Sequence, residues 1–209
     1  MEERIGLYGG TFSPPHIGHY RAAEAFLEQF SLDMLHIMPA SVPPHKAVSP
    51  YDDPTHRYNM ATLAFEPLCR DGRAVVSMLE LEREGKSYTA DTLRELYSLY
   101  NITHEHGIYM LTGTDMFCTL DLWREPEVIF SLAHIVYVSR EHGDGEVCRM
   151  RAEEYREKYG AEVDRLLLTP FEISSTELRA SIARGETTGG VIAPAVMDYI
   201  RKAGLYGGI

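Results

Sequence analysis

The chain has 209 residues, of which 44% are hydrophobic and 24% are charged, and its formal net charge is −11. This length suits one domain, or one domain with a small C-terminal appendage, and it allows a sizeable core. The acidic balance argues against a general nucleic-acid-binding or anionic-membrane surface, because such a surface needs a basic face. A few local donors are enough to bind one phosphorylated small molecule, so that function stays open.

Cysteine usage and hydropathy point to the cytoplasm. The three cysteines, Cys69, Cys118 and Cys148, lie far apart and lack the spacing of metal ligands, which is typical of idle thiols in a reducing compartment. No apolar run approaches a membrane span, and residue 1 leads into a strand rather than a signal peptide. We expect a cytoplasmic protein that binds neither nucleic acid nor membranes; the sequence leaves a homo-oligomer open.

Strand-like and helix-like stretches alternate from the N-terminus. Residues 4–8 predict a strand, 20–30 an amphipathic helix and 34–39 a second, buried strand. Thr55 is the expected cap of a helix from 56 to about 66, in which Arg57 is expected to be solvated. Residues 74–78 predict a third strand, 82–86 a solvated turn, and Thr89 or Asp91 the start of a helix to Tyr100.

The second half continues the alternation. Residues 108–112 predict the clearest strand, followed by a short helix at 127–131, a strand at 134–139, an exposed helix at 146–159 and a strand at 163–168. Helices at 175–184 and 194–203 close the chain; Pro194 suits a first turn and Gly204 a helix end.

This alternation predicts an α/β fold: a Rossmann-like, doubly wound and mostly parallel sheet with helices on both faces. No repeat and no long linker interrupts it, so residues 1–209 are expected to form a single domain. Ligands of such sheets bind beyond the carboxyl ends of the strands. Polar or glycine-rich segments follow four predicted strands, at 9–19, 40–46, 113–115 and 169–176, which favours one composite site.

The segment 9–19 joins the first strand to the first helix and contains three glycines, a Pro-Pro pair and two histidines. Glycines let the backbone approach a bound group, and the start of the next helix favours an anion. His16 and His19 can face the same anion, and core packing would not select them in such a turn. The segment matches neither the dinucleotide fingerprint nor the P-loop. It is therefore predicted to hold a nucleoside triphosphate in some other way.

Two motifs at opposite ends of the chain resemble the signatures of the nucleotidylyltransferase superfamily. Residues 9–19 resemble the N-terminal signature with its His-x-Gly-His core, and residues 173–179 resemble Ile-Ser-Ser-Thr-x-Ile/Val-Arg. Within the superfamily the chain is similar, over nearly its full length, to the bacterial nicotinate-nucleotide adenylyltransferases. Supporting matches lie at 42–46, 56–57, 87–93, 113–115 with Trp123, and 192–194. The shorter pantetheine-phosphate adenylyltransferases share both ends but not the segment 87–93.

The resemblance implies adenylyl transfer from ATP to nicotinate mononucleotide, giving deamido-NAD and pyrophosphate in NAD biosynthesis. The mononucleotide phosphate would attack directly, with no general base and no covalent intermediate, so positioning and charge stabilisation would dominate catalysis. The implied catalytic residues are His16, His19, Lys46 and Arg179. The C-terminal helices, about 175–204, would complete the ATP site, whose implied residues are Gly9, Gly10, Thr11, Phe12, His16, His19, Gly113, Asp115, Ser174, Ser175, Thr176 and Arg179.

The implied mononucleotide-binding residues are Lys46, Tyr88, Thr89 and Trp123. The resemblance implies that Trp123 stacks on the pyridine ring and that Tyr88 and Thr89 meet the nicotinate carboxylate. Structural alternatives stand beside these roles: core packing for Trp123, a solvated surface lysine for Lys46, and helix capping for Thr89, Asp115 and the serines at 174 and 175. No metal site built from protein side chains is expected. Mg²⁺ is expected to come with ATP, held largely by substrate oxygens and water.

Three positions depart from the family pattern. Ser13 stands where Asp is common, Ala40 where Asn is common, and Leu178 where Ile or Val is usual. One rival function is adenylylation of nicotinamide mononucleotide or another phosphate acceptor. A second rival is a catalytically idle nucleotide-binding regulator, against which the intact histidines, lysine and arginine of the motifs argue.

Overall fold

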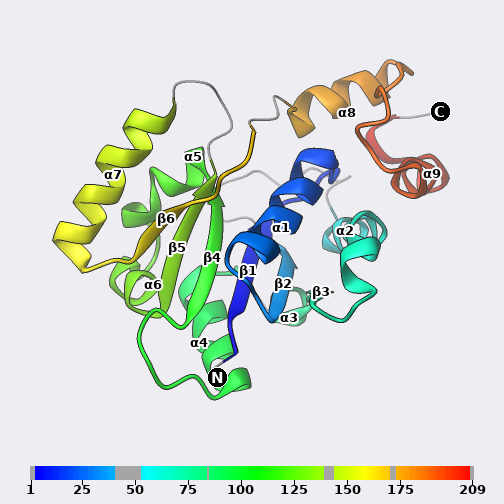
Figure 1. Cartoon of the computed structure of the whole chain (residues 1–209). Helices are drawn as coiled ribbons and strands as arrows, with labels where there is room; N and C mark the ends of the chain where they lie inside the picture. Colours follow the sequence, from blue (N-terminus) through cyan, green and yellow to red (C-terminus); the bar gives the residue numbers. More distant parts are fainter. Residues whose placement is uncertain (1–2, 41–52, 84, 139–143, 170–172, 208–209) are drawn as a thin grey trace.

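The computed structural model describes residues 3–40, 53–83, 85–138, 144–169 and 173–207 (Figure 1). Within these ranges, one parallel sheet has the strand order β3-β2-β1-β4-β5-β6. Its strands are β1 (Ile5–Gly10), β2 (Met34–Pro39), β3 (Ala74–Val76), β4 (Ile108–Gly113), β5 (Ala133–Val138) and β6 (Val163–Arg165). The order reverses direction between β1 and β4, which makes this pair the topological switch point of a doubly wound sheet.

Helices connect the strands and extend the chain beyond the sheet. They are α1 (Ile17–Gln29), α2 (Pro54–Cys69), α3 (Leu79–Glu82), α4 (Thr89–Tyr100), α5 (Thr114–Phe117), α6 (Pro126–Leu132), α7 (Asp144–Tyr159), α8 (Ser175–Ala183) and α9 (Pro194–Lys202), with the 3-10 turns η1 (Leu120–Leu122) and η2 (Leu205–Gly207). None of the described helices is long and apolar enough to cross a membrane.

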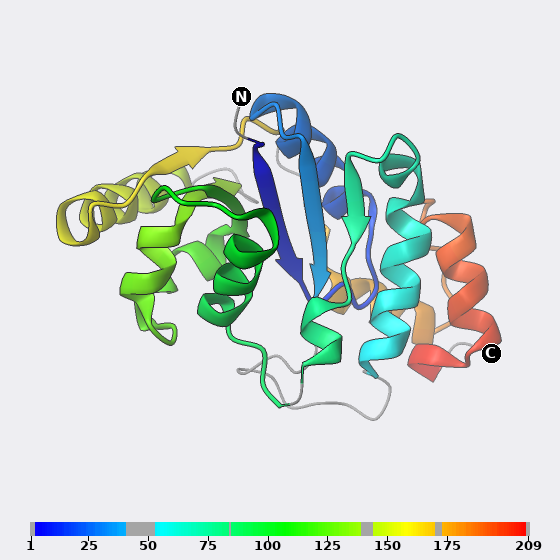
Figure 2. The ribbon, with the colours of Figure 1, turned by 90° about the horizontal axis from the view of Figure 1, so that it is seen from below.

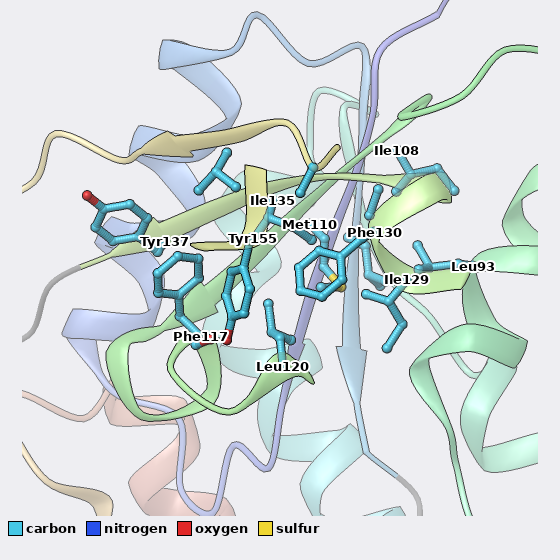
Figure 3. Close-up of a cluster of buried hydrophobic side chains, with 14 of the residues drawn as sticks. Leu93, Ile108, Met110, Phe117, Leu120, Ile129, Phe130, Ile135, Tyr137 and Tyr155 are labelled. Atoms are coloured by element: carbon cyan, nitrogen blue, oxygen red, sulfur yellow. Dashed lines mark hydrogen bonds between the residues drawn. The ribbon is translucent and has the colours of Figure 1, made fainter. Parts of the chain in front are cut away.

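Successive residues of each central strand bury opposite faces of the sheet, because side chains alternate along a strand. In β1, Leu7 packs into a cluster with α4, α6 and α7, whereas Tyr8 packs into a second cluster with α1 and α2. Figure 3 shows the first cluster, in which Met110 of β4 lies among side chains that include Phe130 of α6 and Tyr155 of α7. Helices therefore cover both faces, and the predicted fold class is confirmed.

A third hydrophobic cluster holds the C-terminal elements against the rest of the molecule. It joins Met60 of α2 to buried side chains of α8, α9 and η2, among them Leu178, Val196 and Leu205. Figures 1 and 2 show α9 running beside α2, and Figure 1 shows α8 close to the end of α1 at which that helix begins. The end of the chain is thus packed near the segment that follows β1.

The structure corrects several predicted boundaries. Helix α2 is capped by Asp53, whose Oδ1 accepts a hydrogen bond from the Thr55 N–H at 2.7 Å, so Thr55 is not the cap. The short elements α3, α5 and η1 were not expected, because four or fewer residues show no clear periodicity. Strand β3 ends at Val76 and β6 at Arg165, earlier than predicted, because each pairs with one neighbour over three residues.

Candidate active site

The switch point opens where β1 and β4 end. Pairing between these two strands stops at Tyr8 and Leu111. Beyond that point β1 pairs with β2 as far as Gly10, and β4 pairs with β5 as far as Gly113. The last two residues of each strand therefore separate, and each strand ends in one of the predicted ATP-binding glycines.

The two glycines at the end of β1 serve different purposes. A Cβ on Gly10 would lie 2.8 Å from the ring of Phe12, so the packing of this turn requires glycine there. A Cβ on Gly9 would meet no atom within 4 Å, so glycine at that position instead leaves open space beside the backbone. Such space lets a ligand approach the main chain closely.

Phe12 anchors the turn in the core. Its ring is 1% exposed and packs edge-on against Tyr8 and Phe65. Its backbone has φ of +48°, a left-handed conformation that is costly for a bulky residue and that persists only where the surroundings enforce it. Because the ring is buried in the core beneath the turn, only the backbone of Phe12 could contact ATP.

His16 and His19 lie together at the start of α1, of which His16 is the N-cap residue. Their ring centroids are 3.8 Å apart, and the ring of Phe12 meets His19 edge-on at 5.2 Å. The His16 backbone N–H donates to Nδ1 of His19 at 3.3 Å, so a neutral His19 carries its proton on Nε2. Both rings thus stand at a helix N-terminus, where the helix dipole favours an anion.

The second motif reaches the first through hydrogen bonds to the backbone of the turn. Nη1 of Arg179 donates to the Ser13 carbonyl at 2.7 Å, and Oγ of Ser175 donates to the Pro14 carbonyl at 3.2 Å. Nη2 of Arg179 also donates to Oγ1 of Thr176 at 3.1 Å. The structure therefore joins the two motifs, which lie at opposite ends of the sequence.

Helix α8 starts beside this turn. Oγ of Ser174 caps it by accepting from the Thr176 N–H at 3.2 Å, so the capping interpretation of this serine is confirmed. Ser174 and Thr176 are exposed. The unsatisfied N–H groups of a first helical turn favour an anion, so capping and phosphate binding are compatible at this position.

Arg57 is a site residue that sequence reasoning misjudged. It was expected to be solvated, but it is 1% exposed, and its Nη2 donates to the Ala40 carbonyl at 2.6 Å. The Ala40 N–H in turn donates to the Gly10 carbonyl at 3.0 Å. Arg57 therefore fixes the chain after β2 against the end of β1. The contact uses the backbone of Ala40, where the family commonly has Asn.

The end of β4 presents Gly113 and Asp115. Gly113 is the N-cap of α5, so the alternative in which Asp115 caps the helix is wrong by two positions. Asp115 lies in the first turn and is exposed. Oγ1 of Thr114 donates to the Val138 carbonyl at 3.3 Å and ties this turn to β5.

The residues predicted to bind the mononucleotide stand on two neighbouring segments. Tyr88 is the N-cap of α4 and Thr89 its first residue, so Thr89 does not cap this helix. The Arg124 guanidinium lies over the Tyr88 ring, 4.4 Å from its centroid. Arg124 follows Trp123, which is half-buried against the core cluster of α4 and α6. Trp123 thus takes part in core packing and keeps part of its surface exposed.

A partly buried polar network, unexpected from sequence, supports the start of α4. Oγ1 of Thr92 donates to Oε1 of Glu80 at 2.9 Å, and Nη1 of Arg83 donates to Thr92 at 3.2 Å. Arg83 also pairs with Glu95. Burial raises the pKa of Glu80, although its hydrogen bonds oppose that shift. Arg83 was expected in a solvated turn but is three-quarters buried, with 24% of its side chain exposed.

Lys46 and the rest of 41–52 lie outside the described residues, so the predicted role of Lys46 remains a prediction. Among the described candidates, the ATP residues lie between the end of β1 and the start of α1, at the end of β4, and at the start of α8. The mononucleotide candidates gather at the start of α4 and after η1. Both groups follow carboxyl ends of strands, as the fold rule requires.

The sheet order, the separation of β1 and β4 and the helix starts on either side define a nucleotide-binding α/β protein of the Rossmann-like class. Comparisons with known proteins agree. The family model described as cytidylyltransferase-like matches residues 7–181. A probable nicotinate-nucleotide adenylyltransferase from Desulfitobacterium hafniense (strain Y51) is 36% identical over 207 residues, covering 98% of this chain and 96% of the relative. One from Lachnoclostridium phytofermentans is 34% identical, covering 97% and 98%.

A solved structure has the same fold. The Plasmodium falciparum nicotinic acid mononucleotide adenylyltransferase complexed with NaAD superposes with a TM-score of 0.78 at 19% identity, covering 99% of this chain and 98% of that one. The chain belongs to the cytidylyltransferase-like family and, within it, to the nicotinate-nucleotide adenylyltransferases.

Proposed function

We propose that this chain transfers the adenylyl group of ATP to nicotinate mononucleotide, giving deamido-NAD and pyrophosphate for NAD biosynthesis. Membership of the family supports the reaction. The observation that carries the site is the pair of hydrogen bonds from Arg179 and Ser175 to the backbone of the turn at Ser13 and Pro14. These bonds bring the two signature motifs together, so that in this proposal their donors would bind the phosphates of ATP as one cluster.

The reaction needs little chemical activation, because the attacking phosphate is already ionised. The turn at Gly9 and Gly10 would bring backbone groups and the Thr11 hydroxyl to the triphosphate. His16 and His19 would stabilise the charge that develops as the α-phosphorus is attacked and pyrophosphate leaves. In that role a neutral His19 donates from Nε2, which matches the tautomer that its contact with His16 sets.

The start of α8 would hold the β- and γ-phosphates. Ser174, Ser175 and Thr176 offer hydroxyls and first-turn N–H groups, and Arg179 offers a cation one turn later. Gly113 and Asp115 would line the end of the neighbouring strand β4, near the ribose. In this proposal residues 1–209 work as one domain, in which the C-terminal helices complete the ATP site.

The mononucleotide would occupy the side of the site formed by α4 and Trp123. The exposed part of the Trp123 ring would stack on the pyridine, and Lys46 would contact the phosphate. The start of α4 at Tyr88 and Thr89 would receive the nicotinate carboxylate, because first-turn N–H groups favour an anion. The Arg124 guanidinium lies beside the Tyr88 ring, where it is also within ion-pair distance of Asp91 and Glu125, at 3.8 and 3.7 Å.

Mg²⁺ would enter with ATP. In the part of the chain that the structure describes, no three His, Cys, Asp or Glu side chains gather as a metal cage. In this proposal the ion would be held mainly by phosphate oxygens and water. Asp115 is an exposed carboxylate of the kind that Mg²⁺ takes as a ligand. Held there by the triphosphate and Asp115, the ion would supply positive charge that offsets the negative charge of the leaving pyrophosphate. We also propose a cytoplasmic location, because three cysteines that lie far apart in the sequence and lack the spacing of metal ligands suit a reducing compartment.

Direct transfer makes a specific prediction about products. With MgATP and nicotinate mononucleotide, the chain should release pyrophosphate and form the dinucleotide in equal amounts. Without the mononucleotide, labelled pyrophosphate should not exchange into ATP, because no adenylyl-enzyme forms. Liquid chromatography of the products and an exchange assay measure both. Rapid exchange in the absence of acceptor would refute the direct mechanism, and a lack of dinucleotide would refute the function.

A further inference from the structure

The C-terminal turn η2 touches the phosphate-binding turn directly. The hydroxyl of Tyr206 lies 2.9 Å from Oγ of Ser13, within hydrogen-bond distance. Ser13 is 5% exposed, so this contact is largely shielded from water. Ser13 follows Phe12, whose positive φ must be enforced by its surroundings. Neither sequence motif includes Tyr206.

Tyr206 is itself firmly placed. Its neighbour Leu205 is 2% exposed in the cluster with α2, α8 and α9, and Tyr206 packs against the same cluster. Its hydroxyl also lies 3.9 Å from the sulfur of Met60 on α2. Tyr206 adopts φ of +61°, which non-glycine residues rarely adopt. Sparsely populated backbone conformations of this kind cluster at functional sites, and this one directs a hydroxyl toward the turn of the candidate site.

The contact is one of several that fix this turn from the C-terminal part of the chain. Arg179 holds the Ser13 carbonyl and Ser175 holds the Pro14 carbonyl, at 2.7 and 3.2 Å. The Val191 carbonyl accepts from the Ile17 N–H at 2.8 Å. Tyr206 differs from these partners because it holds a side chain of the turn, at the position where the family commonly has Asp.

We infer that Tyr206 is a positioning residue for ATP: through the Ser13 hydroxyl it holds the turn from Gly9 to His19 in the conformation that receives the triphosphate. The inference rests on the proposed ATP site. The contact between the Ser13 and Tyr206 hydroxyls orders the turn in this chain, in place of the carboxylate that relatives commonly carry at position 13. Tyr206 acts through Ser13, so its loss should weaken ATP binding and leave the mononucleotide side of the site unchanged.

The test is Tyr206→Phe, which removes the hydroxyl and keeps the ring. Titration calorimetry with MgATP should show binding weakened about three- to tenfold, the range expected for one buried hydrogen bond. The KM for ATP should rise in proportion, while the KM for the mononucleotide stays within error. Ser13→Ala should have a similar effect. The double variant should be no worse than the weaker-binding single variant, because both changes break the same contact.

Tyr199→Phe is the matched control. Its hydroxyl lies in the same C-terminal cluster and bonds to His56 and Asn59 of α2, at 2.8 and 2.9 Å, away from the turn. It should lower the melting temperature and leave ATP affinity unchanged. Equal ATP affinity in Tyr206→Phe and wild type, or equal weakening in Tyr199→Phe, would overturn the inference. A wild type that binds MgATP but forms no dinucleotide would refute the proposed function alone, because calorimetry still tests Tyr206.

Discussion

Replacing His19 with Ala should lower kcat by about 10²- to 10³-fold, the loss typical of one donor that stabilises transition-state charge. The ring lies 3.8 Å from that of His16 and is supported by Phe12, so its place at the start of α1 is fixed before substrate binds. Because the interaction strengthens as charge develops, the KM for the mononucleotide should change much less than kcat. Steady-state pyrophosphate release measures both constants.

The fold should survive this substitution, because His19 is half-buried at the surface end of α1. Circular dichroism and the melting temperature check that the variant is native. His104→Ala is the matched control: it removes an exposed histidine from a loop before β4 and should leave kcat unchanged. A His19→Ala enzyme that turns over at nearly the wild-type rate would contradict the assigned role.

Acidification should destabilise the fold through His36. This residue lies in β2, is 5% exposed, and has its Nε2 2.7 Å from the Tyr100 hydroxyl. Burial lowers its pKa from 6.5 to about 4. Its Nδ1 is buried without a hydrogen-bond partner among the described residues. A protonated ring would therefore bury an unpaired N–H as well as a charge.

Because the pKa of His36 is lower in the native state, the free energy of unfolding falls as the pH falls. As the pH falls below 6.5, the His36 ring binds a proton in the unfolded chain, whereas in the native chain it stays neutral until about pH 4. The free energy of unfolding therefore keeps its full value above pH 6.5 and decreases between pH 6.5 and 4, by up to about 3 kcal/mol. Urea unfolding at several pH values should show this loss in wild type, and His36→Phe should lack it. Parallel pH profiles for the two proteins would contradict the prediction.

The fold was predictable from the sequence because its signals are local. Apolar runs such as 108–112 and the helical spacing of 20–30 identify elements before any partner is known. Predicted boundaries were wrong where two nearby residues could each cap a helix. Asp53 caps α2, two residues before the expected cap at Thr55. The elements α3, α5 and η1 were not predicted, because one helical turn has too few residues to show a hydrophobic period.

The site was predictable as far as it lies in the two motifs. Residues such as His16, His19 and Arg179 stand in recognisable patterns. Arg57 and Tyr206 do not: their roles depend on contacts with Ala40 and Ser13, far away in the sequence, and an arginine or a tyrosine alone predicts neither. The network of Glu80, Arg83 and Thr92 was not predicted for the same reason. Its hydrogen bonds form only when α4 packs against residues 80–83 in the folded chain.

All three departures from the family pattern acquire a physical account. The Ser13 hydroxyl lies within hydrogen-bond distance of the Tyr206 hydroxyl, so position 13 keeps a polar contact without a carboxylate. At Ala40 the backbone makes the contacts, with Arg57 and Gly10, and these do not depend on the side chain. Leu178 is buried in the C-terminal cluster, where an apolar residue of similar volume suits the packing.

We propose that this chain adenylylates the acid form of the mononucleotide rather than the amide. The most direct measurement is kcat/KM for pyrophosphate release with nicotinate mononucleotide and with nicotinamide mononucleotide, at saturating MgATP. A helix start that receives a carboxylate should reject the neutral amide, so the acid should be preferred by about 10²-fold or more. Equal values, or a preference for the amide, would contradict the assignment of Tyr88, Thr89 and the start of α4 to the carboxylate.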